Sequence, residues 1–144
     1  MGPRTYPAPP AYPFLKTRDQ TPPMTDSLAI AIAQINPTVG DVAGNLDLVR
    51  NARAEAAKLG ADLVVTGELA LCGYPPEDLV LKRSFQDRIA EAVETLAKET
   101  ADGGPAVLTG APLRQDDKLY NAAVLLDEGK VQVVRFKHEL PNYG

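Results

Sequence analysis

The sequence has little cysteine, no excess of basic side chains and no long apolar run. Its 144 residues include one cysteine, so an internal disulfide and a zinc site of four cysteines are both excluded. Acidic residues number 19 against 15 basic ones, and without residues 1–24, which carry three basic and one acidic side chain, the net charge is −6. Such an acidic body argues against nucleic-acid binding, which needs basic side chains to neutralise phosphates.

Signals for a membrane or for export are also lacking. No apolar run approaches the ~20 residues that span a bilayer, and the proline-broken N-terminus lacks the apolar core of a secretory signal. Internal repeats, heptads, G-x-G-x-x-G loops and metal-ligand spacings are missing as well. The composition therefore predicts a soluble, cytoplasmic protein without membrane or metal partners, and the length predicts about one domain.

The first 24 residues are rich in proline and poor in side chains that could form a core. Seven of the chain's 13 prolines fall there, and proline cannot donate a backbone hydrogen bond. We therefore predict that residues 1–24 are a disordered extension and that residues 25–144 form the folded region. A proline-rich arm can also bind another protein, so a non-catalytic interaction module stays open as an alternative.

The next segment predicts a strand, a helix and a second strand. The nearly continuous apolar run 28–35 is typical of a strand buried on both faces. Apolar residues at helical spacing follow Asn45, which can cap the helix, and Gly60 ends it. Residues 62–66 then form a second strand, so the segment predicts a parallel βαβ unit. The apolar positions of the helix are Leu46, Val49, Ala52, Ala56 and Leu59.

A second helical pattern follows a loop that contains glycine and proline. One helical turn is expected at 77–81, and a longer helix is expected to begin at Ser84, with Asp87 completing an approximate capping box. The buried stripe of this helix is predicted to consist of Phe85, Ile89, Val93 and Leu96.

The remaining pattern predicts three further strands. Residues 106–109 form one strand, and 120–126 and 131–136 flank a glycine-containing turn as a β-hairpin. The fold class is therefore α/β with a mixed sheet. Because the chain stops soon after the last strand, we expect a fragment whose sheet is partly uncovered. The residues expected to be uncovered are Val124, Leu126, Val131 and Val133.

Two charged residues lie where an α/β sheet places its chemistry. Glu68 directly follows a predicted strand inside an apolar run, and Lys137 directly follows the last predicted strand. Open α/β sheets bind ligands at the carboxyl ends of their strands. Burial would raise the pKa of Glu68 and suit it to act as a general base, and a lysine in the same cleft could stabilise an oxyanion. From the pattern alone, a capping role for Glu68 and a solvated Lys137 stay open.

The single cysteine and the single histidine carry weaker signals. Cys72 has no cationic neighbour in the sequence that would lower its thiol pKa, and we interpret it as a packing residue. No G-x-S-x-G motif accompanies His138, so we interpret it as a loop residue rather than part of a serine triad.

Three segments together resemble a known family. They are 31–45 (AIAQINPTVGDVAGN), 67–79 (GELALCGYPPEDL) and 136–144 (FKHELPNYG). These segments resemble the nitrilase, or carbon–nitrogen hydrolase, superfamily, and within it the N-terminal glutaminase domains of the glutamine-dependent NAD synthetase family. The resemblance implies that the α/β fold is part of a four-layer αββα sandwich.

The resemblance also implies roles for individual residues. Glu68 matches the general base, Lys137 matches the lysine that stabilises the tetrahedral intermediate, and Tyr143 lies beside the substrate pocket. The family's nucleophile is a cysteine in a later C-E-D-x-W-like segment that these 144 residues do not include, and Cys72 falls at a position that the family does not use. Residues 25–144 then form the N-terminal half of a glutaminase domain, which is inactive alone.

For a complete protein, the resemblance implies hydrolysis of glutamine and transfer of the ammonia to a C-terminal synthetase domain. That domain uses ATP and Mg²⁺ to convert nicotinic acid adenine dinucleotide to NAD, whereas the glutaminase part needs no cofactor. Members of the superfamily commonly form homo-oligomers. A stand-alone nitrilase-type amidase or carbamoylase would share Glu68 and Lys137 and is the alternative enzyme.

Overall fold

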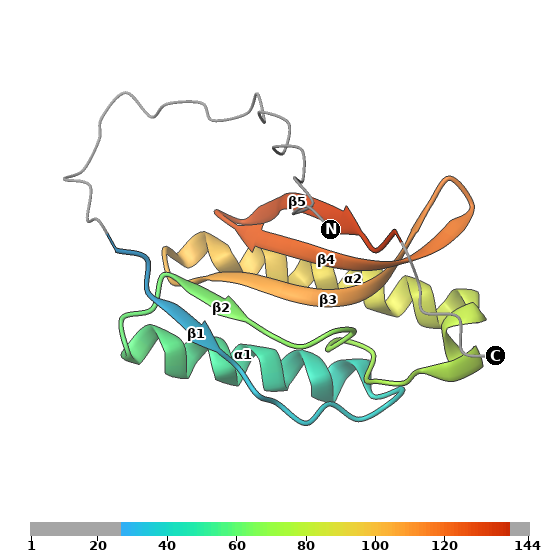
Figure 1. Cartoon of the computed structure of the whole chain (residues 1–144), viewed down its shortest axis with the longest axis horizontal. Helices are drawn as coiled ribbons and strands as arrows, with labels where there is room; N and C mark the ends of the chain where they lie inside the picture. Colours follow the sequence, from blue (N-terminus) through green and yellow to red (C-terminus); the bar gives the residue numbers. More distant parts are fainter. Residues whose placement is uncertain (1–26, 139–144) are drawn as a thin grey trace, which may run out of the picture.

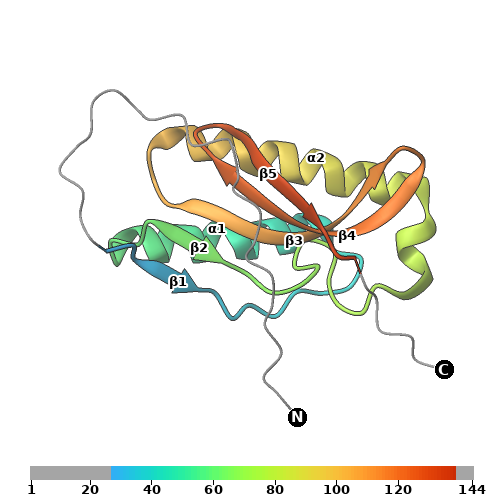
Figure 2. The same cartoon turned by 45° about the horizontal axis from the view of Figure 1, so that its top comes forward.

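The computed structural model describes residues 27–138, which form a five-stranded sheet with two helices packed on one face (Figures 1 and 2). The predicted extension 1–24 and Tyr143 lie outside the described residues. The strands are β1 (Ile30–Ile32), β2 (Leu63–Val65), β3 (Ala106–Gln115), β4 (Lys118–Asp127) and β5 (Lys130–Phe136). The helices are α1 (Val42–Lys58) and α2 (Arg83–Glu99), with short 3₁₀ turns η1 (Glu77–Leu81) and η2 (Thr100–Asp102). None of the described helices is long and apolar enough to cross a membrane.

The sheet is mixed, as the sequence predicts, and its strands lie in chain order from β1 to β5. β1, β2 and β3 run parallel, with α1 and α2 as the two crossover helices, whereas β4 and β5 are each antiparallel to the strand before them. Because β4 reverses the chain direction and β5 reverses it again, β5 runs in the same direction as β2, and both strands finish at the same end of the sheet. The residues that directly follow the two strands therefore lie at this common end.

The first helix begins earlier than the sequence predicts. Asp41, not Asn45, caps α1: its carboxylate accepts a hydrogen bond from the Gly44 backbone N–H at 3.0 Å. Asn45 is buried inside the first turn, where its side chain pairs with both the N–H and the C=O of Thr38. Leu59, expected in the core, is 83% exposed because α1 ends one residue before it.

The second helix buries the predicted stripe but starts differently. Ser84 does not cap α2, which begins at Arg83 without a side-chain cap. Asp87 makes no capping box either, and its carboxylate lies 3.5 Å from the Arg114 guanidinium on β3. The four predicted stripe residues are buried against the sheet and α1, because their spacing places them on one side of the helix. The short turn η1 occupies the predicted residues.

The β3–β4 hairpin is longer than the sequence predicts. β3 continues to Gln115 and β4 already begins at Lys118. The turn residues Asp116 and Asp117 have φ of +50° and +59°, a left-handed conformation that aspartate tolerates better than most residues. The second hairpin turn, at 128–129, lies where the sequence predicts it.

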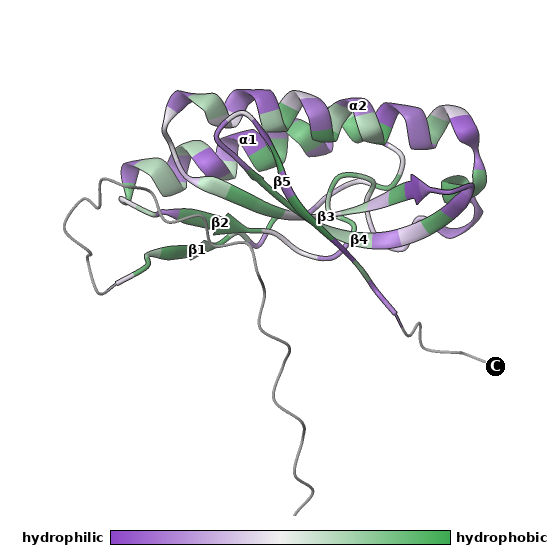
Figure 3. Ribbon diagram, turned by 90° about the horizontal axis from the view of Figure 1, so that it is seen from above, coloured by the Kyte–Doolittle hydropathy of each residue, from purple (hydrophilic) through white to green (hydrophobic). Residues whose placement is uncertain are grey.

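Both helices cover the same face of the sheet, and the other face is open (Figure 3). β1, predicted to be buried on both faces, is therefore exposed: Ile30 and Ile32 retain 52% and 79% of their accessible surface. Strand register and the alternation of side chains place further apolar residues on the open face. They are Leu63, Val65, Leu108, Leu125 and Val133, each partly buried.

The expectation for the hairpin residues is wrong for two of the four. Val124 and Leu126 are fully buried because alternation turns their side chains toward the helices. Val131 is 38% exposed and Val133 is partly buried, as expected for a partly uncovered sheet. Val131 pairs with the helix-facing Leu126, so the uncovered apolar surface on the face opposite the helices comes from the other strand residues, with β1 contributing its most exposed side chains.

A close backbone approach shapes the loop that follows β2. This loop passes over β3 at Gly110, where an added Cβ would lie only 2.4 Å from the Leu69 nitrogen and 2.9 Å from the Gly67 carbonyl oxygen. Leu69 itself has φ of +53°. Gly110 therefore lets the loop that carries Glu68 pack directly on the sheet.

We expect the 144-residue chain, purified alone, to bind a hydrophobic dye and to self-associate through the open face. Ile32→Lys should lower dye fluorescence, because it removes the most exposed apolar side chain of that face. Leu59→Lys is the matched control, since Leu59 is equally exposed but follows α1 on the opposite side of the sheet. Equal effects of the two substitutions, measured by dye titration, would contradict this interpretation.

We expect Gly110→Ala to displace the loop that carries Glu68 and to lower stability by about 1–3 kcal/mol, because the new methyl group meets backbone atoms. Gly67→Ala is the control, since an added Cβ there has no neighbour within 4 Å. Amide chemical shifts of the 66–71 loop and the urea unfolding midpoint measure both effects. A Gly110 variant that behaves like the Gly67 variant would show that the approach is not constraining.

Candidate functional site

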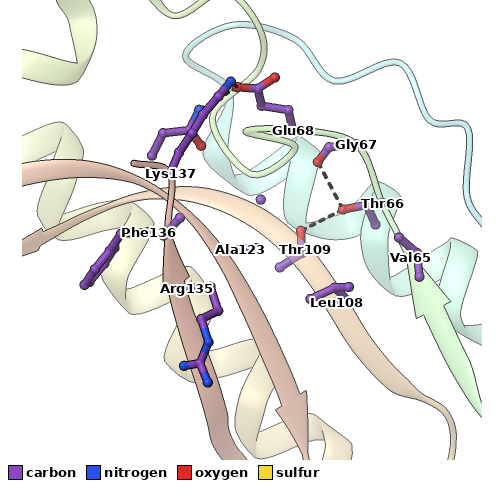
Figure 4. A pocket seen from close by; sticks show the side chains of 13 residues that line it. Val65, Thr66, Gly67, Glu68, Leu108, Thr109, Ala123, Arg135, Phe136 and Lys137 are labelled. Carbon is purple, nitrogen blue, oxygen red and sulfur yellow. Dashed lines mark hydrogen bonds and ion pairs between the residues drawn. The ribbon is translucent and has the colours of Figure 1, made fainter. Parts of the chain in front are cut away.

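Glu68 and Lys137, two residues selected from the sequence, form an ion pair. The Lys137 Nζ donates a hydrogen bond to the Glu68 Oε1 at 2.9 Å, although 69 residues separate them in the chain. Lys137 reaches toward Glu68 from the end of β5 (Figure 4). Glu68 lies three residues past the end of β2. The two charges come together because β2 and β5 finish at the same end of the sheet.

Asn121 is the third member of this cluster, and the sequence analysis missed it. Its side-chain Nδ2 donates to the same Glu68 oxygen at 2.5 Å, and its backbone C=O accepts a hydrogen bond from the Lys137 N–H at 2.8 Å. Asn121 lies on β4, at a position that the sequence analysis included in a strand but gave no role. Only the hairpin register shows that it faces the other two residues.

The charge state of Glu68 differs from the expectation. Burial was expected to raise its pKa, but the side chain is 44% exposed, and the Lys137 ammonium, followed by the Asn121 amide, holds the pKa of the Glu68 carboxyl below its ordinary value. Partial burial opposes this shift without overcoming it. Glu68 is therefore a carboxylate at neutral pH, the form that a general base needs, although the lowered pKa makes it a weaker base.

Two hollows flank Glu68. The first, with a volume of about 350 Å³, opens on the bare face of the sheet and is bordered by the ends of β2 and β5 and the middle of β3 and β4. Thr66 and Thr109, joined by a 2.8 Å hydrogen bond between their hydroxyls, lie along its wall, while Arg135 points away from Glu68 (Figure 4). The second hollow, of about 300 Å³, is bordered by residues 35–37 and Tyr74. Glu68 lines both hollows.

Cys72 lies apart from this site. Its thiol is fully buried, borders neither hollow that Glu68 lines, and contacts the carbonyl oxygens of Leu69 and Gly73. Burial raises the pKa of the Cys72 thiol to about 11, so the reactive thiolate is scarce at neutral pH. These properties match the predicted packing role.

Of the two remaining sequence candidates, only His138 belongs to the described residues. His138 follows Lys137 as an exposed loop residue and lines neither hollow, as expected. Tyr143 lies outside the described residues. Within residues 27–138, no three histidine, cysteine, aspartate or glutamate side chains come close enough together to hold a metal ion.

Sequence comparisons place these features in a family. Residues 29–141 match the carbon–nitrogen hydrolase family. The chain is 41% identical over 121 residues to a glutamine-dependent NAD(+) synthetase of Synechocystis sp. and 42% identical over 117 residues to that of Thermotoga maritima. These matches cover 79% and 81% of the chain but 22% and 20% of the relatives, so the chain spans about a fifth of the length of these curated relatives.

Solved structures with a similar fold include both synthetases and amidases. A glutamine-dependent NAD+ synthetase from Acinetobacter baumannii superimposes with a TM-score of 0.74 at 33% identity, over 80% of this chain and 22% of that one. An amidase from Nesterenkonia sp. superimposes with a TM-score of 0.72 at 29% identity, over 81% of this chain and 44% of that one. The described fold is therefore the nitrilase type of α/β fold, and the chain belongs to the carbon–nitrogen hydrolase family.

Proposed function

We propose that this chain supplies the base and the oxyanion-stabilising lysine of a glutaminase that feeds ammonia to NAD synthesis. The observation that carries the proposal is the 2.9 Å contact between Glu68 and Lys137 beside a 350 Å³ hollow. A carboxylate and an ammonium at the edge of one hollow are the two charges that amide hydrolysis through a thiol needs. Glutamine is proposed as the substrate because the relatives with about 40% identity are glutamine-dependent NAD(+) synthetases.

The proposed reaction is covalent catalysis by a cysteine thiol. Glu68 takes the thiol proton, and the sulfur attacks the carboxamide carbon of glutamine to form a tetrahedral intermediate. When the carbon–nitrogen bond breaks, Glu68 returns the proton to the leaving nitrogen, so that ammonia departs and a thioester remains. Water, deprotonated by Glu68, then attacks the thioester, which releases glutamate and regenerates the thiol.

Lys137 has two tasks in this scheme. Its ammonium keeps Glu68 ionised before the reaction, and it offers a positive charge to the oxyanion when the Glu68 carboxylate becomes neutral by taking up the thiol proton. The attraction between Lys137 and the neutral Glu68 is therefore weaker at the moment when negative charge appears on the substrate. Such a transfer of partners stabilises the transition state more than the ground state.

The nucleophile is not one of the described residues in this proposal. Cys72 is the only cysteine of the sequence, and its buried, weakly acidic thiol lines neither hollow. As the family resemblance implies, the nucleophile is proposed to be a cysteine of a segment outside these 144 residues, and Tyr143 is proposed to border the glutamine pocket. By the family resemblance, ATP and Mg²⁺ would act in a synthetase domain.

A nitrilase-type amidase is the second candidate, favoured by the match to the Nesterenkonia amidase. It would use Glu68 and Lys137 in the same way and would differ in substrate and in the fate of the ammonia. In a complete protein that carries this chain, an assay that compares glutamine with ammonia as the nitrogen source for NAD synthesis separates the two enzymes, because an amidase supports neither.

We expect Glu68→Gln and Lys137→Ala each to abolish glutamine-dependent NAD synthesis while ammonia-dependent synthesis survives. The test protein is a chimera in which residues 29–138 replace the matching segment of the Thermotoga maritima synthetase. Losing the general base costs about 10²–10⁴-fold in rate. The surviving ammonia-dependent rate reports that the synthetase part is folded.

Cys72→Ala in the same chimera is the control and should leave glutamine hydrolysis nearly unchanged. The thiol packs in the core and has no proposed chemical task. Loss of glutamine hydrolysis in a folded Cys72 variant would reassign the nucleophile. If the chimera uses glutamine before any substitution and Glu68→Gln leaves that rate intact, the proposed base is wrong.

We expect the 144-residue chain alone to release no ammonia from glutamine. Its only thiol has a pKa raised by burial to about 11 and lines neither hollow beside Glu68, so no acyl-enzyme can form. A coupled ammonia assay with glutamine at millimolar concentration measures this directly. Ammonia release that disappears in the Cys72→Ala variant would contradict both the assignment of the nucleophile and the packing role of Cys72.

A further inference from the structure

One residue contacts both charged members of the site. Asn121 donates its side-chain N–H to the Glu68 Oε1 and accepts the Lys137 backbone N–H with its own carbonyl oxygen. The two bonds start from different ends of the residue, so Asn121 connects the loop after β2 to the end of β5. Neither the sequence pattern nor the roles given to Glu68 and Lys137 include this residue.

We propose that Asn121 is a positioning residue of this site, which holds the Glu68 carboxylate in the orientation that faces Lys137 and the adjoining hollow. The proposal depends on the proposed function for its catalytic consequence but not for its structural part. Glu68 is 44% exposed, and a carboxylate with a single partner at the surface can rotate with that partner. A second donor on the same oxygen, from a different strand, restricts this rotation.

The sheet holds Asn121 rigidly enough for this task. Its neighbour Ala122 is buried against the helices, and the ring of Tyr120 stacks on Phe136 with centroids 4.4 Å apart. Alternation places Tyr120 and Phe136 on the helix side and Asn121 and Lys137 on the open side of the same two strands. Core packing on one face thus fixes the backbone that presents Asn121 on the other.

The chemistry of the amide suits this position. An amide N–H donates to the carboxylate without adding a charge, so Lys137 stays the cation that pairs with Glu68, and Arg135 on β5 points away (Figure 4). The bond also stabilises the ionised form of the carboxyl, in the same direction as Lys137. An alanine would remove the donor, and an aspartate of nearly the same shape would replace the donor by a second carboxylate.

The direct test is an NMR titration of the Glu68 carboxyl carbon in the 144-residue chain, with Ile32→Lys in every sample to limit self-association through the open face. In Asn121→Ala we expect the pKa of Glu68 to rise toward its ordinary value, and in Asn121→Asp to rise further, because like charges disfavour ionisation. Asn51→Ala, a substitution on the exposed side of α1, is the matched control and should change nothing. The stacked rings of Tyr120 and Phe136 report through their chemical shifts whether the hairpin is intact.

The result decides the structural part in either direction. An unchanged Glu68 pKa in both Asn121 variants, with the ring shifts intact, would overturn the proposal. If the shifts of the stacked Tyr120 and Phe136 rings are lost in Asn121→Ala, the effect of that variant is assigned to unfolding. The nearly isosteric Asn121→Asp, titrated at the same pH values, is then the test of the proposal. A Glu68 pKa that does not rise in a folded Asn121→Asp chain would overturn it as well.

The catalytic part is tested in the chimera described above. We expect Asn121→Ala to lower kcat for glutamine about tenfold to a hundredfold, the loss typical of a misplaced catalytic group, and to leave the ammonia-dependent rate unchanged. The acid limb of the kcat/KM profile should move to higher pH, because Glu68 must be ionised to act. A purely structural role would lower the rate without moving that limb and would therefore contradict the proposal.

The two experiments separate this inference from the proposed function. A chimera that never uses glutamine contradicts the glutaminase assignment, while the Glu68 titration still decides whether Asn121 holds the carboxylate. An active chimera whose Asn121→Ala variant keeps its full rate and pH profile contradicts the positioning role alone.

Discussion

Lys137 reaches Glu68 because β4 reverses the direction of the chain and β5 reverses it again. The register of these strands is set by core residues on the helix side, among them Val124, Leu126 and Phe136. A shift of one residue would turn Lys137 toward the helices and Phe136 toward solvent, because side chains alternate along a strand. The site is therefore a consequence of core packing, and its charged members do not need to hold the strands in place.

The charge balance of the site requires its two ionic groups to act as a unit. An ordinary thiol has a pKa of about 8.5 and an ordinary glutamate about 4.3, so transfer of a thiol proton to glutamate costs roughly 6 kcal/mol in water. The pKa of Glu68 is lowered further by Lys137, which makes Glu68 alone a weak base. The scheme works only if Lys137 stabilises the negative charge that the proton leaves behind, on sulfur and then on oxygen.

The sequence predicts those parts of this molecule that depend on local pattern. The stripe of α2, the turn η1 and the mixed sheet follow from periodicity and turn residues, and the family motifs select Glu68 and Lys137. The cap at Asp41 was missed because Asn45, an equally good capping residue, is used to fasten the preceding loop at Thr38. Asn121 could not be found, since its partner lies 53 residues away and only the hairpin register connects them.

The open face explains why the pKa of Glu68 was misjudged and what would change it. Val65 and Leu108 border the hollow on that face, so the apolar wall expected around Glu68 exists on one side. The other side is open to water, which leaves the carboxylate and the Lys137 ammonium 44% and 40% exposed and keeps desolvation smaller than the effect of the ion pair.

In the four-layer αββα arrangement that the family resemblance implies, a second sheet covers this face. Removing water there raises the cost of both charges together with their attraction, so Glu68 would be pushed toward a higher pKa by burial while Lys137 and Asn121 hold it ionised. The strength of the base is then set by how completely the face is covered, and the three-residue contact limits how far that pKa can rise.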